Sequence, residues 1–301
     1  MAAPTFHDGE TALQRRAGSY ERMVVAGPRV IRDFMPDQHR EFFALLPFLL
    51  AGSVDDTGQP WASVLTGPPG FAQSPDPQLL RVGALPGPHD PLANRLREGM
   101  PIGLLGIQPH TRRRNRMNGT VAALDDGGFS VRVGQSFGNC PKYIQAREPH
   151  YLPDAPAAAA PQLLTALDAS ARRTVAQADT FFIATAHPQA AGGGEPALGV
   201  DVSHRGGPAG FVRVDAAGVL RVADFVGNGF FNTLGNLALE PRCNLLFIDY
   251  ASGELLSVVA RGSVEWTGEA PPEGTALTAR RVRFEVVRVL RTPGALPLRW
   301  T

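Results

Sequence analysis

Asn244-Leu245-Leu246-Phe247-Ile248 closes a block of sequence that begins at Gly199, and Gly103-Leu104-Leu105-Gly106-Ile107 closes a fainter copy that begins at Pro60. In each block a Gly-Phe pair precedes a leucine by 26 or 27 residues, and that leucine precedes the closing isoleucine by 11. The matched positions are Gly70-Phe71, Leu96 and Ile107 in the first block, and Gly210-Phe211, Leu237 and Ile248 in the second. This repeat predicts two copies of one β unit packed together, with a ligand site at the seam. Chance similarity between two β segments is the competing interpretation.

Both halves read as a helix followed by about six short antiparallel strands, which favours small barrels because closure removes exposed strand edges. The sequence therefore predicts a mainly β (α+β) fold. We expect a first repeat with N-terminal helices over 1–148, a Pro/Ala-rich linker over 149–161 and a second repeat over 162–301. Helices are expected over 9–24, 37–46 (with Asp37 as N-cap), 90–97 and 163–178.

Composition excludes several classes of protein. Of 301 residues, 44% are hydrophobic and 19% are charged, which is typical of a globular protein. No apolar run approaches the ~20 residues of a membrane helix, and no signal peptide is visible, so we expect a cytoplasmic protein. The net charge of +1 argues against a nucleic-acid partner. The basic run over 112–116 is interpreted as solvent-facing positions that lead into a strand.

No familiar catalytic or metal motif is present. Two distant cysteines exclude a disulfide scaffold and a Cys-rich zinc site, and the seven histidines lack metal-ligand spacing, so no metal is expected. Cys140 is interpreted as a small buried thiol. The chain has no phosphate loop of the Gly-x-x-x-x-Gly-Lys type, no His-Glu-x-x-His pair and no Gly-x-Ser-x-Gly elbow, and no catalytic residue is assigned.

The informative segment runs from Asp224 to Leu237, a turn that opens a short helix. Short polar side chains at Asn228, Asn232, Thr233 and Asn236 would cluster on the helix N-terminus and one flank, where free N–H groups and the helix dipole favour an anion. The alternative is simple capping, with Asn228 as the N-cap and the other side chains solvated. Spacing alone leaves both open.

These residues resemble a known family. Ser203-His204-Arg205-Gly206-Gly207 and the 227–237 segment look like the FMN-binding split barrels related to pyridoxamine 5′-phosphate oxidase. In the first half, Phe137-Gly138-Asn139-Cys140-Pro141-Lys142-Tyr143 looks like larger members of the same family. The resemblance covers nearly the whole chain and implies two tandem split β-barrels of antiparallel strands with flanking helices.

The family usually holds the FMN phosphate with basic residues in a turn before the short helix. The matching positions here are Phe231, Asn232 and Thr233, so that basic pair is missing. Arg205 and Arg213 are the nearest replacements, because a guanidinium grips phosphate bidentately. Arg213 is equally consistent with a solvent-facing strand position. The cofactor-binding residues that the resemblance implies are Ser203, Arg205, Phe211, Val212, Arg213, Asn228, Asn232, Thr233, Asn236, Asn139, Lys142 and Tyr143.

The segment Asn139–Tyr143 has two interpretations: a contact with the flavin, or a turn that caps the barrel with Tyr143 in the core. The region matching Asn228–Asn236 in the first repeat is 88–94, which has prolines and few donors. We therefore expect one working flavin site, built by the second repeat, with the first repeat as its docking wall.

Three functions follow from the resemblance. The first is an FMN-dependent oxidoreductase that transfers hydride between flavin and a small substrate or NAD(P)H. The second is a flavin-binding or sensing protein without turnover, or one served by a separate reductase. The third is a relative that binds heme or a deazaflavin. Pyridoxamine phosphate oxidation itself is not expected. The relatives are usually dimers, so we expect an intrachain pseudo-dimer or a homodimer.

Overall fold

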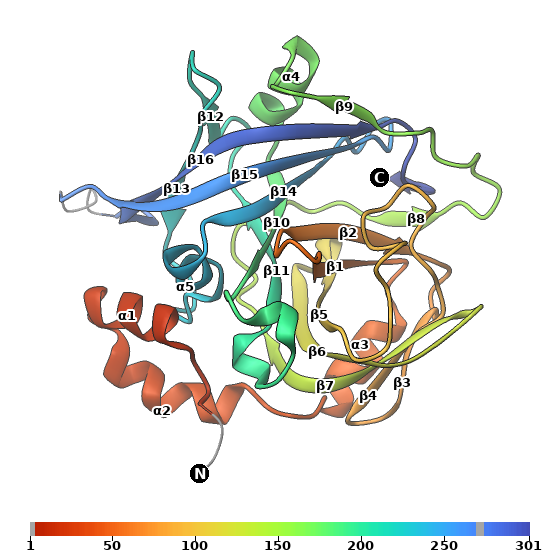
Figure 1. Cartoon of the computed structure of the whole chain (residues 1–301), viewed down its shortest axis with the longest axis horizontal. Helices are drawn as coiled ribbons and strands as arrows, with labels where there is room; N and C mark the ends of the chain where they lie inside the picture. Colours follow the sequence, from red (N-terminus) through yellow and green to blue (C-terminus); the bar gives the residue numbers. More distant parts are fainter. Residues whose placement is uncertain (1–3, 269–273) are drawn as a thin grey trace.

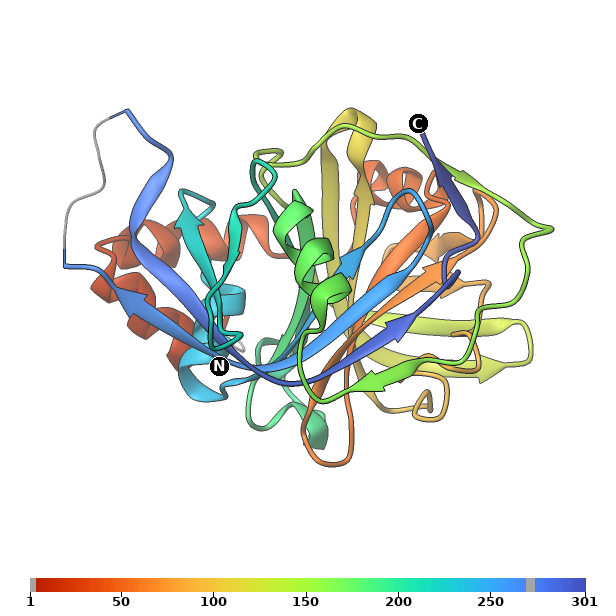
Figure 2. The same cartoon turned by 90° about the horizontal axis from the view of Figure 1, so that it is seen from above.

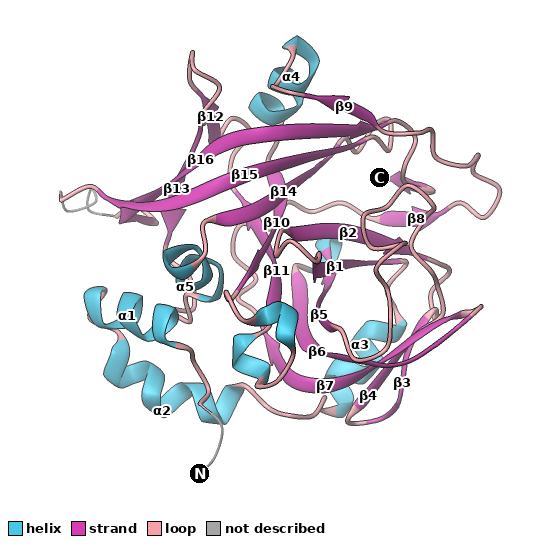
Figure 3. Ribbon diagram, in the orientation of Figure 1, coloured by secondary structure: helices cyan, strands magenta, loops and turns pink. Residues whose placement is uncertain are grey.

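The computed structural model describes residues 4–268 and 274–301 and contains two sheets with the same strand order (Figure 1). The first is ordered β2-β1-β5-β6-β7-β4-β3 and the second β11-β10-β14-β15-β16-β13-β12, all antiparallel. Adding nine to each strand number of the first sheet gives the second, so the repeat predicted from the sequence is present in the topology. The fold is mainly β with split-barrel-like repeats, as predicted, and Figure 3 shows the helices at the periphery of the strands.

The bounds of the strands of the first sheet are β1 Phe48–Val54, β2 Pro60–Thr66, β3 Ala72–Asp76, β4 Leu79–Val82, β5 Pro101–Gln108, β6 Arg113–Asp125 and β7 Gly128–Gly138. Those of the second are β10 Thr180–Ala186, β11 Val200–Gly206, β12 Val212–Val214, β13 Leu220–Phe225, β14 Arg242–Ile248, β15 Leu255–Trp266 and β16 Leu277–Thr292. Three short strands complete the set: β8 Pro149–Tyr151, β9 Gln162–Leu164 and β17 Leu298–Trp300. The helices are α1 Asp8–Arg16, α2 Tyr20–Val30, α3 Asp37–Ala44, α4 Ala169–Gln177 and α5 Asn232–Leu239, with 3-10 turns at Pro109–Thr111, Ala190–Gly192 and Pro196–Leu198.

Central strands are buried on both faces, which explains why they read as continuous apolar runs. Successive side chains of a strand point to opposite faces. Leu49 accordingly enters the core of the first repeat, while Leu50 enters a third cluster between the repeats. In the second repeat Leu245 lies in the core and Leu246 in the same shared cluster. This shared cluster, the seam, joins the two sheets along β1, β5, β10 and β14, and Figure 2 shows the sheets side by side.

Several local expectations are wrong. The helix expected over 9–24 is broken at Gly18, which adopts a left-handed φ of 67°. No helix forms over 90–97, because the Asp90 side chain accepts from the Leu92 N–H in a tight turn. The helix expected over 163–178 begins only at Ala169, because Gln162–Leu164 pairs with β16 as a strand.

Two further differences concern segment ends. Asp37 is the first residue of α3 and Pro36 occupies the cap position, so Asp37 is not the N-cap. The expected linker over 149–161 includes β8, which pairs with β17 near the C-terminus. Among the described residues, no helix is both long enough and apolar enough to cross a membrane.

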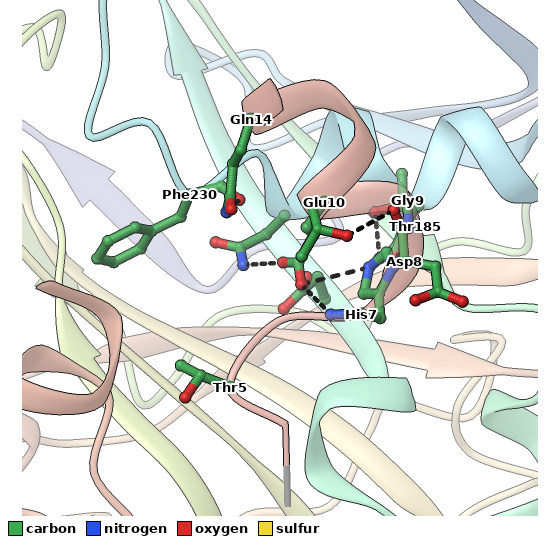
Figure 4. Close-up of polar contacts among 12 residues, drawn as sticks. Thr5, His7, Asp8, Gly9, Glu10, Gln14, Thr185 and Phe230 are labelled. Atoms are coloured by element: carbon green, nitrogen blue, oxygen red, sulfur yellow. Dashed lines mark hydrogen bonds and ion pairs between the residues drawn. The ribbon is translucent and has the colours of Figure 1, made fainter. Parts of the chain in front are cut away.

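Helix α1 packs against α5 of the second repeat, although it lies at the start of the chain (Figure 1). Two glycines allow the close approach: a Cβ on Gly9 would lie 2.3 Å from the Gly235 carbonyl oxygen. The hydrogen bond from the Gln14 amide to the Phe230 carbonyl, at 3.2 Å, fixes the same contact (Figure 4). Helix α1 therefore packs on the short helix that the sequence analysis singled out as a candidate anion site.

Candidate functional site

A cavity of about 290 Å³ lies where the two repeats meet. We call it the seam cavity. The first repeat contributes β6 and the segment after β7, and the second contributes β11, β13, the 226–231 loop and the start of α5. The connection between α1 and α2 adds Ala17 and Ser19, and α2 adds Arg22. The site is therefore built from both copies.

Most of the residues singled out in the sequence lie around this one cavity. Val212 is instead buried in the core of the second repeat, Arg213 is exposed, and Asn236 is buried beside Thr185. Those that line the cavity are Ser203, Arg205, Phe211, Asn228, Asn232, Thr233, Asn139, Lys142 and Tyr143. Their roles toward a ligand stay predictions.

Three of the arginines that line the cavity lie on strands at the seam: Arg114 and Arg116 of β6, and Arg205 of β11. We call them the arginine cluster. Met117 points into the core of the first repeat, so the alternating positions 114 and 116 point across the seam. The interpretation of the 112–116 run as solvent-facing is wrong for these two side chains, and Arg116 is only 3% exposed.

Each arginine of the cluster has a different partner. Arg116 Nη1 donates to Asp201 Oδ1 at 2.9 Å, and its Nη2 contacts the Ser203 hydroxyl. Arg205 Nη1 lies 3.9 Å from Asp224 Oδ1, at the outer limit of an ion pair. Among the described residues, Arg114 has no carboxylate within ion-pair distance.

The neutral partners of Arg114 are the His204 imidazole and a backbone carbonyl. Its Nη1 lies 2.8 Å from His204 Nδ1 and its Nε donates to the Cys140 carbonyl at 2.9 Å. Burial and the nearby Arg205 charge lower the pKa of Arg114 to about 10. Burial, followed by the Arg114 and Arg205 charges, lowers the pKa of His204 well below its usual value, so this imidazole stays neutral. The cavity wall thus holds cationic charge that the protein itself leaves uncompensated.

The repulsion extends to a fourth arginine, Arg280 of β16. Burial lowers the pKa of Arg205, the Asp224 carboxylate opposes this shift, and the Arg116 and Arg280 charges add to it. Asp224 accepts from Arg280 Nε at 3.0 Å and lies 2.8 Å from its Nη2. One carboxylate therefore serves both Arg205 and Arg280, and a bound anion would relieve the remaining repulsion.

Two buried polar atoms on the cavity wall have no hydrogen-bond partner in the described structure: Arg116 Nε and Asn139 Nδ2. Buried N–H groups are nearly always paired, and an unpaired one costs roughly 1–3 kcal/mol. Both atoms are donors, so the missing partner would be an acceptor. This agrees with the charge of the wall.

The short helix begins differently from the prediction. Phe231 occupies the cap position in a left-handed conformation, with φ 65°, and Asn228 instead accepts from the Phe230 N–H at 3.1 Å. Asn228 as N-cap is therefore wrong. Thr233 and Ser203 hydroxyls lie 2.9 Å apart, which places two hydroxyls beside Arg116.

The segment after β7 faces the cavity. Tyr143 is partly exposed and stacks on Phe225, with ring centroids 4.9 Å apart, while its hydroxyl donates to the Val226 carbonyl at 3.1 Å. The alternative that placed Tyr143 in the core is wrong. Cys140 is half-buried and lines the cavity, so the expectation of a buried thiol is also wrong.

Helix α1 carries a buried carboxyl, Glu10, that the sequence analysis missed (Figure 4). Glu10 Oε1 accepts from Asn232 Nδ2 at 2.5 Å, and Oε2 accepts from the His7 N–H at 2.9 Å. Burial, with the nearby Asp201 charge, raises the pKa of Glu10 to about 8. Glu10 thus connects α1 to a residue of the cavity wall.

The two repeats are not equivalent at this site. Leu105 of β5 and Leu246 of β14 are matched positions of the two repeats. Arg116 is the strand partner of Leu105 and Ser257 is the strand partner of Leu246, so Ser257 occupies the position that matches Arg116. The same matching relates Arg114 to Leu255, and Arg205 to Leu65. The arginine cluster thus has no counterpart at the related positions across the seam, and the expectation of one flavin site stays a prediction.

Arg114 and Arg116 of β6 are the main site residues that the sequence analysis did not predict. The signal was present as basic residues at i and i+2 of a predicted strand, which places them on one face. Which face they occupy depends on the second repeat lying across the seam, and no local pattern reports that contact.

No protein-family model matches the sequence, and no curated protein sequence matches it. Among solved structures, the chain is similar to a variant of HupZ from Group A Streptococcus, at 9% sequence identity and a TM-score of 0.31. That match covers 42% of this chain and 98% of the HupZ chain. The likeness is distant, and the function proposed below rests on the residues of this chain.

Proposed function

We propose that the chain binds FMN in the seam cavity, with the phosphate at the arginine cluster. The observation that carries the proposal is Arg114, a largely enclosed guanidinium with no carboxylate partner among the described residues. A phosphate group carries nearly two negative charges at neutral pH and accepts several charge-assisted hydrogen bonds. Arg114 and Arg205 supply charge from the two repeats, and the unpaired Arg116 Nε supplies a further donor.

The remaining walls fit the rest of the cofactor. Tyr143, Phe225 and Phe231 offer aromatic surface at the cavity, and Asn139 offers an unpaired amide donor. When bound, FMN supplies hydride transfer, and the protein supplies binding, orientation and exclusion of water. We infer an oxidoreductase that passes hydride between the flavin and a small substrate or NAD(P)H. Assembly of two chains into a homodimer stays a prediction, which light scattering can test.

Titration of FMN into the purified protein, followed by quenching of flavin fluorescence, tests the proposal. Arg114→Gln should weaken FMN binding by roughly 1.5–3 kcal/mol, because it removes a charged donor without leaving a carboxylate unpaired. Arg213→Gln is the matched control, since Arg213 is an exposed arginine outside the cavity. Equal FMN affinity in the two variants, or no FMN binding by the wild type, would overturn the proposal. A Soret band after addition of heme, without flavin binding, would favour the heme-binding alternative.

A further inference from the structure

One part of the seam cavity extends into the core of the second repeat. The side chains that line it there also belong to that core, and they are 7% exposed or less. We call this part the core recess; it is lined by Phe181, Ile183, Val222, Leu234, Leu237, Val282 and Phe284, with the half-buried Phe211 against them.

The core recess is apolar and partly aromatic. Phe181 and Phe211 stack with ring centroids 5.7 Å apart and an interplanar angle of 18°. Burial of apolar surface stabilises a ligand by roughly 25 cal/mol per Å², so this wall favours a hydrocarbon or aromatic group. The whole cavity, at about 290 Å³, is at the lower end of the range of ligand sites, which favours a small molecule over a long-chain lipid.

Charged residues lie next to the recess. Arg205 of β11 is paired directly opposite Phe181 of β10, and Arg280 precedes Val282 by two positions on β16. Both line the cavity together with Asp224 of β13 and Thr278, whose hydroxyl donates to Asp224 Oδ2 at 3.1 Å. Two guanidiniums share one carboxylate, so this end keeps one positive charge in excess.

We propose that the core recess binds the apolar part of a small organic monoanion, whose carboxylate or sulfonate pairs with Arg280. As the substrate class of a flavoprotein, this rests on the proposed function; as a binding site, it stands without it. The arginine cluster remains for the FMN phosphate, so the two anionic groups contact different arginines of the cavity.

A fluorescent aromatic monoanion, 8-anilinonaphthalene-1-sulfonate, is a suitable probe of the recess. We expect saturable fluorescence with one probe per chain. Val222→Phe fills the recess and should weaken probe binding at least tenfold, while FMN affinity changes less than twofold. Arg280→Gln should weaken probe binding about fivefold, because it removes the excess charge and leaves Asp224 paired with Arg205.

The matched control is Val82→Phe, at the corresponding position of β4 in the first repeat, where Val82 is fully buried and lines no part of the seam cavity. Val82→Phe should lower the melting temperature through overpacking, whereas Val222→Phe should leave it unchanged or raise it.

Each result has a defined consequence. Unchanged probe binding in Val222→Phe would overturn the proposal that the recess binds a ligand. An equal loss of melting temperature in Val222→Phe and Val82→Phe would also overturn it. A matching loss of FMN affinity in Val222→Phe would also overturn it, because the flavin itself would then occupy the space. Probe binding as expected without any FMN binding would refute the proposed function and leave the recess standing.

Discussion

Replacing the buried Glu10 carboxyl with a group that cannot ionise should change how stability depends on pH. Glu10 is 3% exposed and accepts from the Asn232 side chain and the His7 backbone. Because its pKa rises from 4.5 to about 8 in the folded protein, the folded state holds a proton that the unfolded state has already lost. The contribution of Glu10 to the free energy of unfolding therefore falls as pH rises from about 4.5 to 8 and is level above that range.

The size of the effect follows from the pKa of Glu10. A rise from 4.5 to about 8 corresponds to roughly 5 kcal/mol at 1.36 kcal/mol per pH unit. Undocking of α1 limits the penalty, because the carboxyl then reaches water without global unfolding. Glu10→Gln keeps the shape and cannot ionise, so its advantage over wild type should grow by roughly 2–5 kcal/mol between pH 4.5 and pH 8.

Urea denaturation of both proteins across this pH range measures that difference. His7, whose pKa is lowered to about 4, mainly by burial, destabilises the fold as pH falls from about 6.5 to 4, which is the opposite pH direction from the effect of Glu10. Glu21→Gln, at an exposed position of α2, is the control: its difference in stability from wild type should not change with pH in this way. A difference between Glu10→Gln and wild type that stays constant with pH would refute the buried, protonated carboxyl.

Three further outcomes follow from the packing. Gly9→Ala should destabilise the protein by about 1–3 kcal/mol in thermal denaturation, because its Cβ would meet the Gly235 carbonyl. Gly87→Ala, with open space around it, should be neutral, and equal effects of the two variants would exclude the close contact between α1 and α5. Ellman's reagent should modify one thiol per native chain, and Cys140→Ser should abolish this reaction, because Cys243 is fully buried and burial raises the pKa of its thiol well above the usual value; two reactive native thiols would contradict the burial. Equilibrium dialysis should find one FMN per chain, and two would show that the related positions, without the arginines, also bind.

The strand repeat could be predicted from the sequence because it rests on local alternation and spacing. Leu245 and Leu246 serve two different cores, which is why their run is continuously apolar. The helices were less predictable. The backbone pairing of Gln162–Leu164 with β16 outweighs the helical pattern of the residues that follow, and a distant strand supplies it.

Part of the candidate site could be predicted from the sequence and part of it could not. Residues of the 203–205 and 227–233 segments lie together because they are near in sequence or on neighbouring elements. Arg114 and Arg116 approach them only because the second sheet packs across the seam. Glu10 reaches Asn232 across 222 positions of sequence, through a helix contact that depends on Gly9 and Gly235. These long-range contacts have no local signal.

Comparison of FMN with riboflavin tests the central claim most directly, because the two differ only in the phosphate. Fluorescence titration of the wild type should give FMN binding at least tenfold tighter than riboflavin binding, since charge-assisted hydrogen bonds to the phosphate add roughly 1.5–3 kcal/mol. The ratio should shrink toward one in Arg114→Gln and persist in Arg213→Gln. Equal affinity of the wild type for FMN and riboflavin, or binding of neither, would contradict a phosphate site at the arginine cluster.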